Sequence, residues 1–121
     1  MTEANIQSLI LRELTRDPSV RLFRNNSGIG WAGTLLRKTD DGTVVLGNAR
    51  PLHAGLFRGS ADLIGWRSGR FLSIEVKSET GRVTPAQLNW MFAARNAGGI
   101  AGIVRSVEEA EFLIANNQIS P

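Results

Sequence analysis

Cysteine and tyrosine are absent from this 121-residue chain, and histidine occurs once. Without cysteine the chain can form neither a disulfide nor a thiolate metal site. His53 alone argues against a histidine-rich zinc site. No apolar run approaches the roughly 20 residues needed to cross a bilayer, and the first residues lack a signal-peptide pattern. We therefore expect a single domain over residues 1–121, in the cytoplasm and without membrane contact.

Because cysteine and tyrosine are absent, the isoelectric point overstates how basic the chain is. Its isoelectric point is about 10.6, yet its net charge is only +3, because little titrates between neutral pH and the lysines. Residues 1–60 carry eight bases and five acids, and residues 61–121 carry six of each. Twelve of the fourteen bases are arginine, whose planar fork matches a phosphate. Composition alone leaves both a polyanionic partner and a plain solvated surface open.

Hydrophobic periodicity and turn residues predict an α/β chain in which helices flank a mixed sheet, in the order α-β-β-β-β-β-α-β-α. A helix between the last two strands implies that they pair in parallel. Glycine-rich segments predict irregular loops, and Asp40-Asp41-Gly42 predicts a hairpin. The expected helices span residues 2–16, 84–96 and 106–117; the strands span 20–26, 34–38, 43–46, 62–66, 71–77 and 100–105; the loops span 27–30 and 47–60.

Asp62, Glu75 and Lys77 form the main chemical constellation. Side chains alternate along a strand, so Glu75 and Lys77 project from the same face, about 7 Å apart at a rise of roughly 3.3 Å per residue. A four-residue turn keeps Asp62 on the neighbouring strand, where it can approach Glu75. From these residues alone, the alternative is a cross-strand salt bridge on a solvated face.

Neighbouring carboxylates need a cation, because two unit charges 4 Å apart repel by about 4 kcal/mol at an effective dielectric near 20. A hard divalent ion such as Mg²⁺ or Mn²⁺ suits oxygen ligands. The carbonyl of Val76 could add a neutral ligand. Such an ion would acidify a water and neutralise a phosphate, while Lys77 would position that water or stabilise transition-state charge.

Three other features lie outside this constellation, and each has a structural alternative. Glu3 opens the first helix, where an acid is favourable in any case. Thr84-Pro85-Ala86-Gln87 begins a helix, and Gln87 could simply complete its capping box. Arg24-Asn25-Asn26-Ser27-Gly28 gathers hydrogen-bond donors at a strand end, or forms an ordinary turn.

Taken together, these residues resemble the VRR-NUC family, the virus-type replication-repair nucleases of the PD-(D/E)xK restriction-endonuclease-like superfamily. The likeness rests on motifs in order along nearly the whole chain. One departure is Ala61, where the motif usually has proline. The matching motifs are Glu3, Arg24-Asn25, Gly59-Ser60-Ala61-Asp62-Leu63, Ile74-Glu75-Val76-Lys77 and Thr84-Pro85-Ala86-Gln87.

The resemblance implies roles for these residues. Asp62, Glu75 and the Val76 carbonyl would bind the metal, and Glu3 would join them directly or through water. Lys77 would be the catalytic lysine, with Gln87 orienting it or the scissile phosphate. An arginine-lined surface would hold the DNA backbone, and the candidate contacts are Arg24, Asn25, Asn26, Arg58 and Ser60.

Small stand-alone members of the family look like phage or bacterial enzymes that act on branched DNA, including four-way (Holliday) junctions, and are similar to homodimers. We therefore expect a Mg²⁺- or Mn²⁺-dependent endonuclease of DNA repair with no nucleotide cofactor. Alternatives are a flap or restriction-like nuclease, a non-catalytic DNA-binding module, and a plain structural domain. Core packing is expected for at least two of Trp31, Trp66 and Trp90, and a dimer seam is the other reading.

Overall fold

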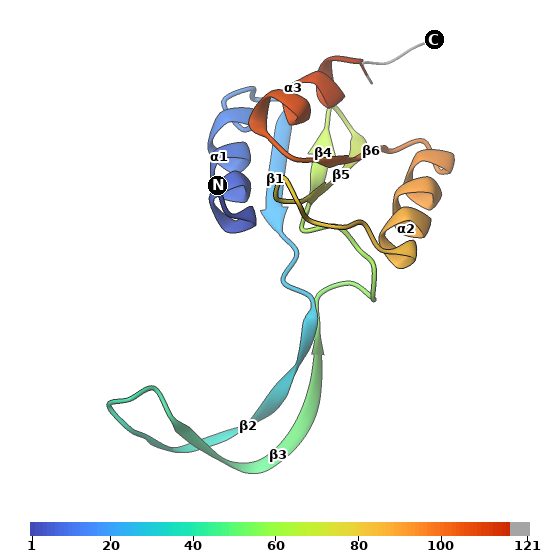
Figure 1. The fold of residues 1–121 in the computed structure, drawn as a ribbon. Helices are drawn as coiled ribbons and strands as arrows, with labels where there is room; N and C mark the ends of the chain where they lie inside the picture. Colours follow the sequence, from blue (N-terminus) through green and yellow to red (C-terminus); the bar gives the residue numbers. More distant parts are fainter. Residues whose placement is uncertain (117–121) are drawn as a thin grey trace.

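The structure is a computed structural model that describes residues 1–116, so the predicted helix end at residue 117 lies outside it. Within these residues, three helices and six strands follow one another in the order predicted from the sequence (Figure 1). The chain is therefore a mixed α and β structure. Its elements are α1 (Glu3–Leu14), β1 (Val20–Arg24), β2 (Gly28–Lys38), β3 (Val44–Ala54), β4 (Leu63–Arg67), β5 (Arg70–Val76), α2 (Pro85–Asn96), β6 (Ile100–Val104) and α3 (Val107–Asn116).

Four of the strands form a mixed sheet in the order β1-β4-β5-β6. The first two pairings are antiparallel, and β5 pairs with β6 in parallel, as the intervening helix α2 predicted. Helices α1 and α3 lie on one face of this sheet and α2 lies on the other (Figure 1). Both faces of β5 are therefore covered, and residues 72–76 are all buried.

The hydrophobic core lies between the sheet and the pair of helices α1 and α3. Ile10, Leu63, Leu72, Ile74 and Val76 are completely buried there. Periodicity accounts for this: α1 contributes Ile6, Ile10 and Leu14 at helical spacing, and β5 contributes every second residue. None of the described helices is long and apolar enough to span a membrane.

Residues 28–54 form a long two-stranded arm that projects from the four-stranded sheet (Figure 1). The prediction of loops at residues 27–30 and 47–60 is therefore wrong over most of their length, since β2 begins at Gly28 and β3 continues to Ala54. Glycine and proline suggested loops, but a two-stranded ribbon leaves every edge open and tolerates both residues.

The predicted hairpin turn closes this arm. Asp41 accepts hydrogen bonds from the Thr43 amide, at 3.0 Å, and from the Thr39 hydroxyl, and these bonds lower the pKa of Asp41 to about 2. Gly42 has a φ of 88°, a value that glycine reaches without steric cost. Two register shifts, between Ala32 and Thr34 and between Leu35 and Arg37, interrupt the ladder. Such bulges bend a ribbon, and the arm is visibly curved (Figure 1).

The pairing of β1 with β4 depends on Gly65. A Cβ at this position would lie 1.8 Å from the Arg21 carbonyl oxygen, which belongs to the neighbouring strand. We expect Gly65→Ala to lower the free energy of unfolding by about 3 kcal/mol or more, because backbone rather than a flexible side chain must move. Urea unfolding followed by circular dichroism measures this loss.

Gly30→Ala is the matched control, because a Cβ there meets nothing within 4 Å. Equal stabilities of the two variants would contradict this account of the β1–β4 pairing.

Candidate active site

Strand β5 carries the polar residues of the site on the face that α2 covers. Ser73, Glu75 and Lys77 alternate with the core residues Ile74 and Val76, as the period of two predicted. They are buried, with exposed fractions of 1%, 5% and 9%. Ser73 accepts a 2.8 Å hydrogen bond from the Trp90 indole of α2, which ties the helix to this face.

Asp62 reaches the end of β5 from the residue before β4. The β4–β5 register pairs Leu63 with Ile74, so the preceding Asp62 lies beside Glu75. The sequence predicted this placement from the short turn between the two strands. Its carboxylate accepts a 2.9 Å hydrogen bond from the Val76 amide. A carboxylate held by a main-chain donor has its orientation fixed by the sheet itself.

Asp62 and Glu75 crowd each other electrostatically. The pKa of Glu75 is raised to about 8, chiefly by burial and then by the hydrogen bond and the negative charge of Asp62, against the opposing charge of Lys77. Two carboxyl groups sharing one site cannot both ionise at low cost. Without a cation, Glu75 therefore keeps its proton up to about pH 8, and a divalent cation with a preference for carboxylate oxygens would favour the ionised form of both groups.

The alternative of a solvated salt bridge is wrong. In the described part of the chain, no ion pair within 4 Å joins Lys77 to Asp62 or Glu75. Glu75 and Lys77 are also buried instead of facing solvent, and Asp62 is half-buried. Sequence alternation gave the shared face correctly, but it could not show that a helix covers that face.

Asn25 holds the segment that leads into Asp62. Its amide group donates 2.8 Å hydrogen bonds to the Ser60 hydroxyl and the Ala61 carbonyl, and its side-chain oxygen accepts one from the Leu56 amide. Its main-chain amide donates to the Asp62 carbonyl at 2.7 Å. Asn25 and Ser60, predicted as DNA contacts, thus lie together and fix the backbone on the approach to the site.

The remaining predicted residues lie at varying distances from this group. Arg24 donates to Gln7 and Ser8 of α1, at 2.8 and 2.9 Å, and Asn26 and Arg58 are exposed. Gln87 and Thr84 form the reciprocal capping box of α2. Glu3 lies in the exposed first turn of α1, and no cluster of three His, Cys, Asp or Glu side chains occurs among the described residues. The fold therefore does not bring Glu3 directly beside Asp62 and Glu75.

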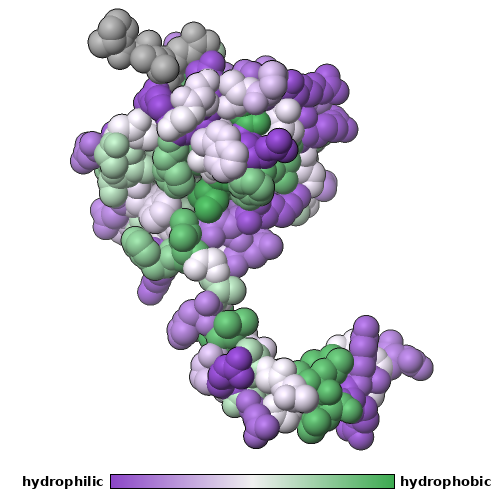
Figure 2. Space-filling model, turned by 180° about the vertical axis from the view of Figure 1, so that it is seen from behind, coloured by the Kyte–Doolittle hydropathy of each residue, from purple (hydrophilic) through white to green (hydrophobic). Residues whose placement is uncertain are grey.

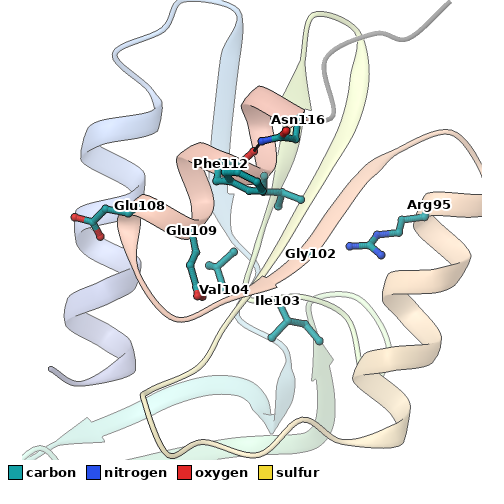
Figure 3. A pocket seen from close by; sticks show the side chains of 9 residues that line it. Arg95, Gly102, Ile103, Val104, Glu108, Glu109, Phe112 and Asn116 are labelled. Carbon is teal, nitrogen blue, oxygen red and sulfur yellow. Dashed lines mark hydrogen bonds between the residues drawn. The ribbon is translucent and has the colours of Figure 1, made fainter.

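Asp62 and Glu75 line neither of two hollows in the surface. One, of about 610 Å³, lies between β6 and α3 and is lined by Val104, Glu109 and Phe112 among others (Figure 3). The other, of about 560 Å³, lies beside α2. Pocket size alone would thus have missed the residues that carry the chemistry.

Comparison with known proteins agrees with this geometry. The VRR-NUC domain model matches residues 47–108, which is just over half of the chain and includes Asp62, Glu75, Lys77 and Gln87. The chain belongs to the VRR-NUC family. No curated protein matches it. Membership of the VRR-NUC family implies a nuclease domain, and hence a hydrolase with DNA as substrate. Glu3 and the Arg24-Asn25 motif lie outside the matched segment.

Three tryptophans do not behave as the sequence suggested. Trp31 is 65% exposed and Trp66 is 50% exposed, so the prediction that at least two of the three pack in the core is wrong. Trp66 instead stacks on Phe23 at the surface, with ring centroids 5.7 Å apart. Trp90 was not predicted to belong to the site, but it donates a hydrogen bond to Ser73 on the face that carries Glu75.

The raised pKa of Glu75 makes the free energy of unfolding depend on pH. Its pKa is about 8 in the fold and 4.5 ordinarily, so folding takes up a proton between these values and the free energy of unfolding falls as pH rises through this window. In EDTA, we expect Glu75→Gln to remove this fall and to be more stable than the parent at pH 8, by an amount on the order of 1–3 kcal/mol. Urea unfolding at pH 5 and pH 8 provides the test.

Glu79→Gln serves as the control, since Glu79 is an exposed acid of the following loop. The account is wrong if Glu75→Gln retains the parent's dependence on pH.

Proposed function

We propose that this VRR-NUC protein is a metal-dependent, structure-selective endonuclease that hydrolyses phosphodiester bonds in branched DNA, with four-way junctions as the main substrate, and that it acts as a homodimer. The observation that supports this most directly is the pairing of the half-buried Asp62 with the buried Glu75, with Lys77 buried directly after β5. A core of the PD-(D/E)xK type, formed by the whole of residues 1–121, belongs to the same proposal.

Asp62, Glu75 and the Val76 carbonyl would hold Mg²⁺ or Mn²⁺, with Glu3 joining through water. Bound there, the ion would acidify a water molecule and neutralise charge on the phosphate. Lys77 would hold its ammonium group toward the developing charge of the transition state, where a positioned cation is most effective in a dry site. Gln87, at the start of α2, would help to orient Lys77 or the phosphate.

Other polar residues would hold the DNA backbone near this site. Arg58 and Asn26 are exposed and would contact phosphates, whereas Arg24, Asn25 and Ser60 have internal partners and would hold the contacting segment in place. Phosphate contacts of this kind are salt-sensitive and blind to sequence. A preference for branched DNA must then come from shape.

Lys77→Ala tests the assigned site. With Mg²⁺ and a labelled four-way junction, we expect its cleavage rate to fall by about 100-fold or more, because the transition-state cation is lost. Lys38→Ala provides a matched control at the exposed end of β2, since the chain has only these two lysines. Equal rates for Lys77→Ala and the parent would sink the assignment.

The same assay separates the other candidate activities when flap, single-stranded and plain duplex substrates are included. Symmetric paired nicks in the junction support resolution, and faster cutting of a flap or duplex supports a flap or restriction-like nuclease. Junction binding without cleavage in Mg²⁺ or Mn²⁺ supports a non-catalytic module.

The homodimer proposal draws on the arm formed by β2 and β3. An isolated two-stranded ribbon is marginally stable in water, yet this one exposes a set of large apolar side chains. Figure 2 shows a hydrophobic group near the far end of the arm, next to a hydrophilic tip, and a smaller hydrophobic group near the base of the arm. The exposed apolar side chains are Ile29, Trp31, Leu35, Leu36, Val44, Val45 and Leu52.

A second copy is the partner that this surface fits best. The arm carries three bases against two acids, a weak charge for a surface that would bind DNA by itself. A two-fold dimer would also supply the two matched cuts that junction resolution needs.

Removing apolar side chains from the arm should therefore separate the protomers. We expect the parent to have twice the mass of the chain in light scattering, and Trp31→Ser combined with Leu36→Ser to have the mass of one chain. Phe112→Ser removes an equally exposed ring from α3 and should leave the dimer intact. A monomeric parent at tens of micromolar would overturn the dimer proposal.

A further inference from the structure

An apolar hollow of about 560 Å³ opens between the turn after β3, strand β5 and helix α2. Aromatic rings from Phe57, Phe71 and Trp90 line one part, and small residues of α2, including Ala93 and Ala97, line the other. Small side chains along the helix leave the space open, and the volume lies within the range of sites that bind small organic groups.

The rings around the hollow are held in fixed orientations. Trp90 lies edge-on to both phenylalanines, with centroids 5.5 Å from Phe57 and 6.3 Å from Phe71. The Trp90 indole N–H is already bonded to Ser73, so only hydrocarbon faces the hollow from this ring. Phe57 is 76% exposed, which leaves most of its ring available for stacking.

This hollow shares a face of the sheet with the catalytic candidates. Phe71, Ser73, Glu75 and Lys77 alternate along β5 toward the same side, and Ser73 lies about 7 Å from Glu75 at the usual strand rise. The turn that carries Phe57 is anchored on α2, because Gly59, at a φ of 91°, packs directly on the Ala86 carbonyl. Phe57 and Asp62 are thus rigidly connected by four residues.

Arg58 gives this apolar hollow a cationic rim. Its guanidinium is exposed, next to Phe57 in sequence and close to the segment that Asn25 holds. Flat hydrocarbon walls with one arginine at the rim suit a ligand with an aromatic ring and a phosphate, which is the chemistry of a nucleotide.

We propose that this hollow binds one unpaired nucleobase of the DNA strand beside the scissile phosphate, with Phe57 stacking on the base and Arg58 contacting its phosphate. The inference rests on the proposed nuclease function and deepens it. Extruding a base costs unpairing and unstacking energy within a regular duplex and less where pairing or stacking is already interrupted, so the site would favour branched DNA with a frayed or unpaired base at the branch point. An apolar segment of a second copy would make no use of Arg58.

A double-mutant cycle tests this proposal through binding, independently of cleavage. The junction's branch-point nucleotides are replaced one at a time by abasic nucleotides, and fluorescence anisotropy in EDTA gives the Kd for the parent and for Phe57→Ala. We expect one abasic position to weaken parent binding by roughly 5- to 100-fold, the range of one stacked base. Phe57→Ala should weaken binding to the intact junction by the same factor. Combining Phe57→Ala with the abasic junction should weaken binding no further.

Phe112→Ala, which removes an exposed ring from α3, should bind like the parent, and Phe57→Trp should retain the coupling. Additive losses, or parent-like binding by Phe57→Ala, overturn the base site. A change in mass of Phe57→Ala together with additive losses would mean that a second copy fills the hollow, which also overturns it. If Phe57 and the base are coupled in binding but no Mg²⁺-dependent cleavage occurs, the base site stands and the nuclease proposal is refuted. If cleavage depends on Lys77 but Phe57 and the base are not coupled, the nuclease proposal stands and the base site is refuted.

Discussion

The constraint on which this structure depends is the close placement of two carboxylates at the end of the β4–β5 hairpin. Asp62 and Glu75 are buried enough that one of them holds its proton up to about pH 8. Repulsion between like charges at such a distance costs several kcal/mol at a dielectric typical of proteins. The pair persists because the sheet enforces it: the hairpin register sets Asp62 opposite Glu75, and the Val76 amide holds the Asp62 carboxylate.

Polar residues near the Asp62–Glu75 pair hold the backbone that positions it. Asn25 uses both its side chain and its main chain to fix residues 56–62 against the end of β1. Asn26, the next residue, is exposed. The sequence presents the two asparagines as equivalent donors, and only the fold separates a positioning residue from one that can contact a ligand. A motif that resembles a DNA-binding loop can therefore serve to position the Asp62–Glu75 pair.

The sequence was most informative where local rules decide the structure. Strand alternation placed Glu75 and Lys77 together, and the capping box set the start of α2. The sequence was not informative where the structure depends on a distant element. Nothing in residues 71–77 indicates that the polar face of β5 is buried. The length of the arm was missed for another reason, since Gly47 and Pro51 are rare in sheet interiors but acceptable in an open ribbon. Its exposed apolar residues look like core residues in a window of sequence.

The burial of the polar face also changes how DNA can reach the site. If β5 faced solvent, a smooth duplex could lie across Glu75 and Lys77. Instead, α2 stands over this face, and Trp90 is bonded to Ser73 beside the acidic pair. A strand must then approach along the margin of α2, where the turn at residues 55–59 and its exposed Phe57 already lie. Under the proposed function, a single strand with an unstacked base would follow such a margin more readily than a stiff duplex.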